Sequence, residues 1–279
     1  FIDSKGDHPG LNENEIEKNI TKRTKAIVAV HYAGVACDMD KIMQIAEKYD
    51  LFVVEDAAQA IDSYYMDKHL GGIGDFGCFS FHETKNIHCG EGGLLTINNP
   101  EFKKRSEIIW EKGTNRAEFF RGEVNKYGWV DIGSSFLPSE MNAAFLYAQI
   151  ENLNNIQNKR KAIWKQYYKG LKPLEDKGYL KLPVIPEYAT NNAHMFYLVC
   201  NTADERTKLI QHLKKNGVHA VFHYLSLHKS DYYEDKHDGR DLPNADIYTD
   251  CLVRLPMYYG IKREEIKLVV RKVREFWLL

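Results

Sequence analysis

Leu51-Phe52-Val53-Val54-Glu55-Asp56-Ala57-Ala58-Gln59 is the stretch of the chain that decides the fold. Its four apolar residues, two of them β-branched, predict a short buried strand over 51–54. Two acids follow the strand directly. A carboxylate in this position can cap the next helix or take part in chemistry, and taken alone Asp56 is more often a cap. Its interpretation therefore depends on the residues that the fold brings near it.

Strands and helices alternate on both sides of this stretch. Ala26–Val30 predicts another buried strand, and Asp38 is placed to cap a helix with apolar residues at helical spacing. Further strands are expected over 76–81 and 93–97, and Asn99 with Pro100 predicts the start of a helix. Such alternation predicts an α/β fold with a mostly parallel sheet and helices on both faces, in which ligands bind at the carboxyl ends of the strands.

The second half of the chain has a different organisation. Residues 113–137 show little periodicity, and a loop of this length in a compact domain is usually functional. A helix is expected from about 138 to 170, followed by the strand 195–200, the helix 203–216, the strand 218–223 and a last helix over 263–277. We therefore expect residues 1–150 to belong to a large domain, and 151–279 to form a linking helix and a small α+β domain.

The second informative stretch is Phe79-Ser80-Phe81-His82-Glu83-Thr84-Lys85-Asn86, followed by the turn residues Gly90-Glu91-Gly92-Gly93. Most lysines are solvated surface charges, but Lys85 and Asp56 both follow predicted strands. Ser80 stands where its hydroxyl could reach a phosphate. This combination is typical of a pyridoxal phosphate (PLP) site, in which a lysine forms a Schiff base and an acid keeps the pyridine nitrogen protonated. Burial would lower the pKa of such a lysine, so that its free amine can also move a proton.

Composition excludes several other classes of protein. The chain has 279 residues, of which 44% are hydrophobic and 28% charged, as in ordinary globular proteins. A formal net charge of -1 argues against binding to nucleic acid or to an anionic membrane. No apolar run approaches the roughly 20 residues of a membrane span, and no signal peptide is visible, so we expect a cytoplasmic enzyme.

Other patterns are less informative. The five cysteines are scattered without a C-x-x-C pair, which predicts free thiols. Gly72–Gly77 satisfies G-x-G-x-x-G, but it precedes a predicted strand, whereas a dinucleotide site requires it to follow one. His219 and His223 could be considered as metal ligands, but they lie on an apparent strand, and we predict no metal site. His223 is more plausible as a residue of a sugar or cofactor pocket.

Longer motifs give a resemblance to a known family. The motifs that carry it are 81–86, 90–93, Glu111-Lys112-Gly113-Thr114-Asn115-Arg116, Phe119-Phe120-Arg121-Gly122, Asp131-Ile132-Gly133-Ser134-Ser135 and Val221-Phe222-His223-Tyr224. With these motifs the chain resembles the DegT/DnrJ/EryC1/StrS sugar aminotransferases over nearly its whole length. Within that group it is most similar to the dTDP-4-amino-4,6-dideoxygalactose transaminases.

The resemblance implies a PLP-dependent transferase of fold type I, like aspartate aminotransferase. It implies that Lys85 carries PLP, that Asp56 pairs with the pyridine nitrogen, and that Gln59 and Ser80 bind near the phenolic oxygen and the phosphate. Glutamate would donate the amino group, and a nucleotide-linked keto-sugar would accept it. The resemblance also implies a homodimer with composite active sites, into which the 113–137 segment of the partner reaches.

Further candidates for the substrate site come from the same motifs. Arg116 and Arg121 suit bidentate contacts to a nucleotide diphosphate, although packing of this segment on a partner subunit is an equally good interpretation. His223 and Tyr224 are candidates for the sugar pocket. Ser135 stands where many relatives have an asparagine that contacts the partner's phosphate, and its hydroxyl could make a similar contact.

An opening segment of the family and several alternative functions also bear on this assignment. The family has an opening segment, with a glycine turn that grips the PLP phosphate, which precedes Phe1, and we expect the sequence to be a portion of the enzyme. Members that act on a 3-keto sugar, and a truncated fragment without PLP or activity, remain alternatives. Family dehydratases have histidine in place of the Schiff-base lysine, and the presence of Lys85 argues against that class.

Overall fold

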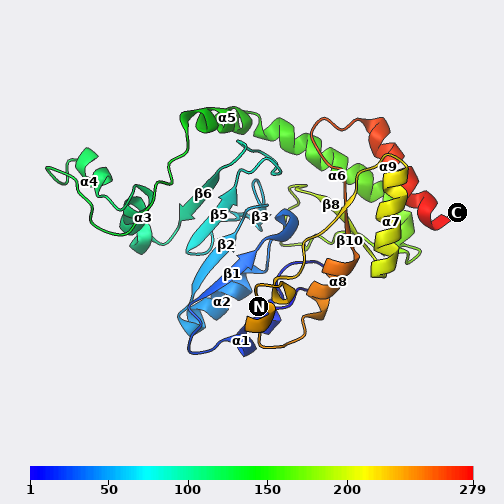
Figure 1. The fold of residues 1–279 in the computed structure, drawn as a ribbon, viewed down its shortest axis with the longest axis horizontal. Coiled ribbons are helices and arrows are strands. Elements are labelled where there is room, and N and C mark those ends of the chain that lie inside the picture. Colours follow the sequence, from blue (N-terminus) through cyan, green and yellow to red (C-terminus); the bar gives the residue numbers. More distant parts are fainter. Residues whose placement is uncertain (279) are drawn as a thin grey trace.

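The first half of the chain is built on a four-stranded sheet, seen at the centre of Figure 1 in a computed structural model that describes residues 1–278. Its strands are β1 (Ala26–Val30), β2 (Phe52–Asp56), β5 (Phe76–Ser80) and β6 (Gly93–Ile97), in that order across the sheet. β1, β2 and β5 run parallel, whereas β6 is antiparallel to β5. The mostly parallel sheet is thus confirmed, and the carboxyl ends of three strands meet at one edge.

Helix α2 (Met39–Tyr49) covers one face of this sheet. Asp38 caps it as expected, because its carboxylate accepts a hydrogen bond from the Lys41 N–H at 3.3 Å. The helix ends at Asp50, which adopts a left-handed conformation with a φ of 52°. Its apolar side packs with the inward-facing residues of β1 and β2 in one buried cluster that includes Met39, Ile42, Ala46, Ile27, Ala29 and Val53.

The opposite face of the sheet is largely bare within residues 1–278. Val28 and Val30 of β1 are 55% and 44% exposed, and Leu95 of β6 is 52% exposed. Only at the amino end of the strands does an aromatic side chain, Phe102, pack on this face, against Phe52 and Phe76. Helices on both faces are therefore not seen in the part of the chain that the structure describes. Paired strand residues share a face, so Asp56, opposite Val30, lies on the bare side.

The long helix expected between 138 and 170 is two helices, α5 (Glu140–Glu151) and α6 (Leu153–Glu175). Asn152 interrupts them, with φ -98° and ψ 7° and its side-chain amide donating to the carbonyl of Ala148. Figure 1 shows α5 running along the top of the first sheet and α6 continuing toward the second half of the chain.

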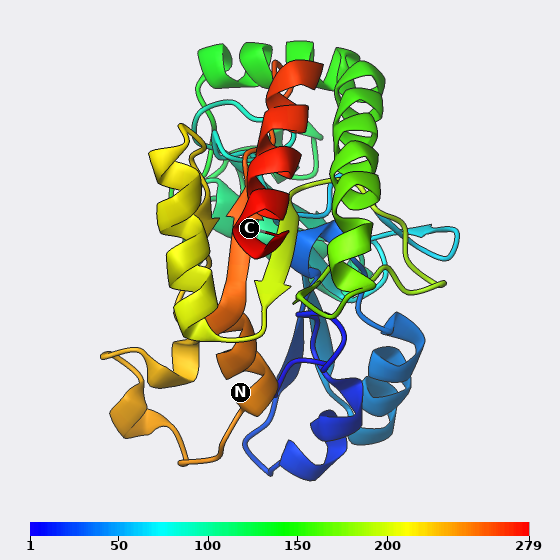
Figure 2. The same cartoon turned by 90° about the vertical axis from the view of Figure 1, so that its right-hand side faces the viewer.

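A second sheet, with strand order β7-β8-β10-β9, organises the second half and is antiparallel throughout. Its strands are β7 (Leu180–Lys181), β8 (Phe196–Cys200), β9 (Val221–Phe222) and β10 (Leu252–Leu255). Helices α6, α7 (Ala203–Lys215) and α9 (Arg263–Leu278) form a layer on it, which faces the viewer in Figure 2. This is the α+β arrangement that the sequence predicts. The domain boundary near residue 150 stays a prediction.

Residues 103–137 form an arm that extends away from both sheets (Figure 1). It contains α3 (Lys103–Trp110) and α4 (Arg116–Phe120), so the segment 113–137 is not wholly without regular structure. The remaining elements are η1 (Glu13–Glu15), α1 (Ile16–Asn19), η2 (Tyr32–Gly34), β3 (Tyr64–Tyr65), β4 (Lys68–His69), η3 (Pro100–Phe102), η4 (Leu227–Lys229), η5 (Glu234–Lys236) and α8 (Pro243–Cys251). Among residues 1–278, no helix combines the length and apolar character that a membrane crossing requires.

Candidate active site

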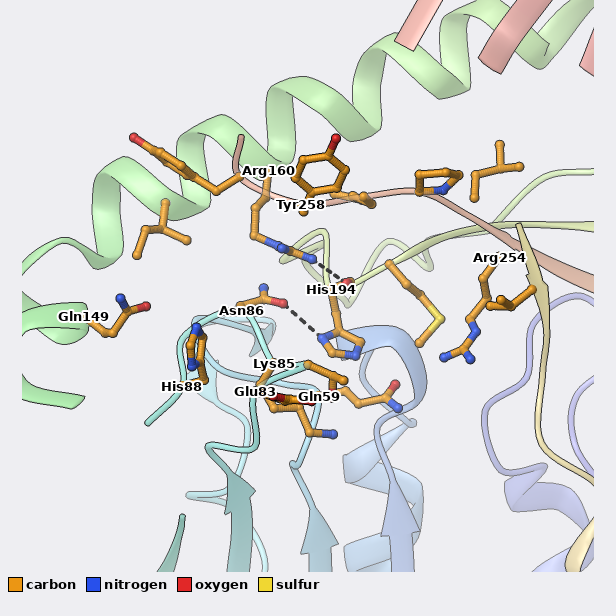
Figure 3. Close-up of a pocket in the computed structure, with 18 of the residues that line it drawn as sticks. Gln59, Glu83, Lys85, Asn86, His88, Gln149, Arg160, His194, Arg254 and Tyr258 are labelled. Carbon is orange, nitrogen blue, oxygen red and sulfur yellow. Dashed lines mark hydrogen bonds between the residues drawn. The ribbon is translucent and has the colours of Figure 1, made fainter. Parts of the chain in front are cut away.

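A cavity of about 920 Å³ lies between the strand ends of the first sheet and the elements of the second half. Lys85, Gln59 and Asn86 come from the first sheet's side, and Arg160, His194 and Arg254 from the other (Figure 3). Because the carboxyl ends of parallel strands are the usual ligand site of an α/β sheet, this cavity is the natural place for chemistry.

Lys85 lies in a tight turn immediately after β5, where its backbone N–H donates to the carbonyl of His82 at 2.9 Å. Burial lowers the pKa of the Lys85 amine, while the negative charge of the nearby Asp56 opposes this shift. The lowered pKa raises the fraction of neutral amine, which is the form that attacks a carbonyl carbon.

Asp56 and Ser80 belong to the adjacent strands β2 and β5. The Asp56 carboxylate accepts a hydrogen bond from the Ala58 N–H at 3.1 Å, and Asp56 pairs with Cys78 across the sheet. Ser80, two residues further along β5, accepts from the His82 N–H at 3.3 Å, which leaves its hydroxyl hydrogen available to a phosphate oxygen. The strand register therefore places a carboxylate and a hydroxyl on the bare face of the sheet, and the Asp56 carboxylate is near enough for its charge to act on the Lys85 amine.

Gln59 is held by a specific contact. Its side-chain oxygen accepts a hydrogen bond of 2.6 Å from the N–H of Ala33, a residue with a φ of 56° in the turn after β1. Its backbone carbonyl accepts from the Asn192 side chain at 2.8 Å. With the oxygen engaged, the amide NH₂ group of Gln59 remains as the donor on the cavity side.

Glu55, the neighbour of Asp56, anchors the end of β2 in the core. Its fully buried carboxylate accepts hydrogen bonds from His31 Nε2 at 3.0 Å and from the N–H groups of Gly71, Ile73 and Gly74 at 2.7–2.8 Å. Burial acts to raise the pKa of this carboxyl, but these four hydrogen bonds together lower it. The loop 71–74 and the end of β1 are thus tied to the strand that presents Asp56.

Asn86 connects Lys85 to the second half of the chain. Its amide donates to Gln157 of α6 at 2.9 Å, and its oxygen accepts from His194 Nδ1 at 3.0 Å. Burial, reinforced by the positive charges of Arg160 and Lys85, lowers the pKa of His194 to about 3. His194 is therefore neutral at ordinary pH, and with Nδ1 donating, its Nε2 is an acceptor.

The predicted substrate residues fall into two groups. Tyr224 lines the cavity, and His223 packs edge-on against its ring and that of Tyr32. Arg116 and Arg121 lie on the arm instead, where Arg116 pairs with Glu111 at 2.5 Å and Arg121 with glutamates of the same segment.

Ser135 is also on the arm, in an isolated bridge with Glu111. The structure does not bring these three residues to the cavity of their own chain, and their roles stay predictions.

The other sequence patterns have structural explanations. Gly77 of the G-x-G-x-x-G stretch lies within β5, where a Cβ would fall 2.2 Å from the carbonyl oxygen of Gly71, so close packing of the backbone accounts for it. Residues 1–278 hold no group of three or more His, Cys, Asp or Glu side chains arranged for a metal ion.

Sequence reasoning missed several residues of the cavity, among them Asn86, His194 and Arg254, and it also missed Tyr32, whose ring contacts His223 beside the cavity. Arg254 is a cation between the apolar residues of a predicted core strand, Leu252-Val253-Arg254-Leu255, and that break in the pattern was a usable signal. Tyr32 and His194 gave none, because only the tertiary fold brings them to the strand ends.

Comparisons with known proteins agree on one family. The sequence profile of the DegT/DnrJ/EryC1/StrS aminotransferase family matches residues 1–274. The uncharacterized protein MJ1066 of Methanocaldococcus jannaschii is 33% identical over 283 positions, which cover 99% of this chain and 72% of that protein.

Solved structures give the same result. An aminotransferase from Psychrobacter cryohalolentis superposes with a TM-score of 0.92 at 25% identity, over 100% of this chain and 75% of that one. DesV from S. venezuelae, solved in complex with a ketimine intermediate, superposes with a TM-score of 0.87 at 29% identity, over 99% and 71% of the two chains. These agreements confirm the fold type I architecture and the class of enzyme, a PLP-dependent aminotransferase. The chain belongs to the DegT/DnrJ/EryC1/StrS aminotransferase family.

Proposed function

We propose that this protein transfers the amino group of glutamate to a nucleotide-linked keto-sugar, converting dTDP-4-keto-6-deoxyglucose into dTDP-4-amino-4,6-dideoxygalactose. One observation carries the proposal: Lys85, its pKa lowered by burial, lies close to Asp56 at neighbouring strand ends and lines a large cavity. The choice of sugar rests on the motifs around Lys85, in the arm and at 221–224.

The residues present fit PLP. The Lys85 amine would hold the cofactor covalently, the Asp56 carboxylate would pair with the protonated pyridine nitrogen, and the free hydroxyl hydrogen of Ser80 would reach the phosphate. The free amide donor of Gln59 would contact the phenolic oxygen. When bound, PLP supplies an electron sink for the carbon that loses or gains a proton.

Lys85 would then act as the proton carrier. With PLP bound, the Lys85 amine, whose pKa burial lowers, would take a proton from one carbon and return it to another. Glutamate would leave as 2-oxoglutarate in the first half-reaction, and the keto carbon of the sugar would receive the amino group in the second. The neutral His194, held by Asn86, offers an acceptor to a hydroxyl group in the same cavity.

A homodimer is part of the proposal. Helix α5 exposes Met141 and Phe145 at 81% and 50%, and the arm exposes Trp129 and Ile132 at 82% and 79%. Large apolar side chains that are this exposed are typical of a surface that a partner covers. A second copy of the chain would cover them, and Arg116, Arg121 and Ser135 would then contribute to the partner's active site. We propose the cytoplasm as the location, where glutamate is available.

The test uses absorbance and product analysis. PLP added to the protein should give the visible band of a lysine-bound cofactor, and Lys85→Ala should abolish it while Lys68→Ala, an exposed lysine, keeps it. The PLP-loaded protein is then given glutamate with 4-keto and 3-keto nucleotide sugars, and the products are analysed by mass spectrometry and NMR. Amination of only 3-keto sugars would favour that alternative substrate. Absence of the band would favour the inactive fragment.

A further inference from the structure

Arg254 is a cation without a counter-ion on the wall of the cavity. It lies on β10, opposite Tyr197 of β8 and Val221 of β9, and its side chain points toward the side of the cavity where Gln59 and Lys85 lie (Figure 3). Within residues 1–278 it forms no ion pair, and its Nε is buried without a hydrogen-bond partner. Its Nη2 donates a long hydrogen bond of 3.5 Å to the carbonyl of Phe222. Its guanidinium carbon lies 5.5 Å from the centre of the Tyr224 ring.

Two further polar atoms near Arg254 are also buried and without partners: the hydroxyl of Tyr32 and Nδ1 of His223. The two rings meet edge to face, with centroids 4.9 Å apart. Burial, with the charge of Arg254 added, lowers the pKa of His223 to about 4, so this histidine is neutral at ordinary pH. Burial also raises the pKa of Tyr32, which keeps its hydroxyl protonated.

Unpartnered buried polar atoms are uncommon and call for an explanation. Here a guanidinium, a tyrosine hydroxyl and an imidazole come from both halves of the chain to one place, and two of these groups are donors. A carboxylate suits them, because its two oxygens can accept from the guanidinium and from the hydroxyl together.

Charge balance favours a carboxylate over a diphosphate. Of the cationic side chains that line the cavity, Arg160 already donates to the carbonyls of Ala193 and His194, and Lys85 is assigned to the cofactor. Arg254 is then the single free cation among the described lining residues, and it matches one negative charge.

We propose that Arg254, with Tyr32 and His223, forms the subsite that binds a carboxylate of the amino donor. The inference rests on the proposed function, since it assigns the donor to the cavity of Lys85. It also gives the donor a contact with each half of the chain, because Tyr32 follows β1 whereas Arg254 and His223 come from the second sheet and its flank.

The test measures binding without turnover. Glutarate keeps the two carboxylates of glutamate and lacks the amino group, so its affinity for the PLP-loaded protein can be measured by calorimetry. dTDP is titrated separately as the diphosphate probe. Arg254→Gln should weaken glutarate binding about 10- to 100-fold, as expected for the loss of hydrogen bonds to a charged group, and leave dTDP binding unchanged. Tyr32→Phe should weaken glutarate about 2- to 10-fold.

Arg274→Gln, on the exposed outer face of α9, is the matched control and should change neither affinity. Arg254→Lys keeps the charge without the planar fork and should bind glutarate with intermediate affinity, which also tests the site if the glutamine variant unfolds. Unchanged glutarate binding in both Arg254 variants, or a loss confined to dTDP, overturns the carboxylate subsite. If the wild-type protein gives the visible PLP band but the Arg254 variants show either of these two outcomes, the carboxylate subsite is refuted and the proposed function is not. If the band is missing, the proposed function fails, and glutarate binding by the protein alone still reports on Arg254.

Discussion

Replacing Glu55 with glutamine gives a direct measure of how strongly the end of β2 is anchored. One carboxylate oxygen accepts from His31 Nε2 and the Gly71 N–H, and the other accepts from the N–H groups of Ile73 and Gly74. A glutamine amide retains one oxygen, so its NH₂ group faces two donors whichever way it turns. Each orphaned buried donor costs about 1–3 kcal/mol, and Glu55→Gln should therefore lower the free energy of unfolding by about 2–6 kcal/mol.

The pH dependence gives a second, independent readout. The folded-state pKa of Glu55 is lowered, so its stabilising contribution is full above the ordinary carboxyl value of 4.5 and is lost as pH falls through the folded-state value. Glu55→Gln removes a carboxyl, and its stability should decline less steeply in acid than that of the wild-type protein. The difference between the two proteins should therefore be larger at neutral pH than in acid.

Urea unfolding followed by circular dichroism measures both effects, with Glu47→Gln on the exposed surface of α2 as the matched control. The control should change the free energy by less than about 0.5 kcal/mol. If Glu55→Gln loses less than about 1 kcal/mol at neutral pH, the four hydrogen bonds do not anchor the end of β2. The conclusion that they hold in place the strand that presents Asp56 is then refuted.

Three further predictions concern other parts of the chain. Asp3 accepts hydrogen bonds from the N–H groups of Asn244 and Ala245 in the first turn of α8, so Asp3→Ala should cost about 0.5–2 kcal/mol in thermal unfolding, and no loss relative to Asp67→Ala, an exposed aspartate, would exclude this cap. Because burial lowers the pKa of Lys85, the rate of PLP capture followed against pH should reach half its maximum below 10.5, and a midpoint at or above that value would contradict the lowered pKa. Phe145→Glu on α5 should convert the proposed dimer into monomers in analytical ultracentrifugation, whereas Gln166→Glu on the exposed side of α6 should not; a dimer that survives both changes uses another surface.

Local signals predicted much of the fold. The strand 93–97 and the caps Asp38 and Asn99 are as expected, because β-branched runs, capping side chains and proline act over a few residues. The helix expected over 138–170 breaks at Asn152, and the strand expected over 218–223 is only Val221–Phe222, since tertiary packing decides such ends.

The site was predictable only where its residues lie near one another in sequence or follow strands. That Lys85 and Asp56 lie near each other could be predicted because parallel strands place their carboxyl ends together, whereas Gln59 was expected only from the family resemblance. The contacts of Asn86 with His194, and of Tyr32 with His223, join segments far apart in the chain, and no local pattern encodes them.

The arm of residues 103–137 has a consequence for how the enzyme would behave at low concentration. None of its side chains belongs to a buried apolar cluster of the described residues, and several of its largest apolar groups face solvent. If a second copy supplies the missing packing, the stability of the arm is linked by mass action to the amount of protein present. Specific activity would then fall on dilution and recover on concentration, and proteases would cleave the arm fastest in dilute samples. In a cell, the level of expression would set the activity of each molecule as well as the number of molecules.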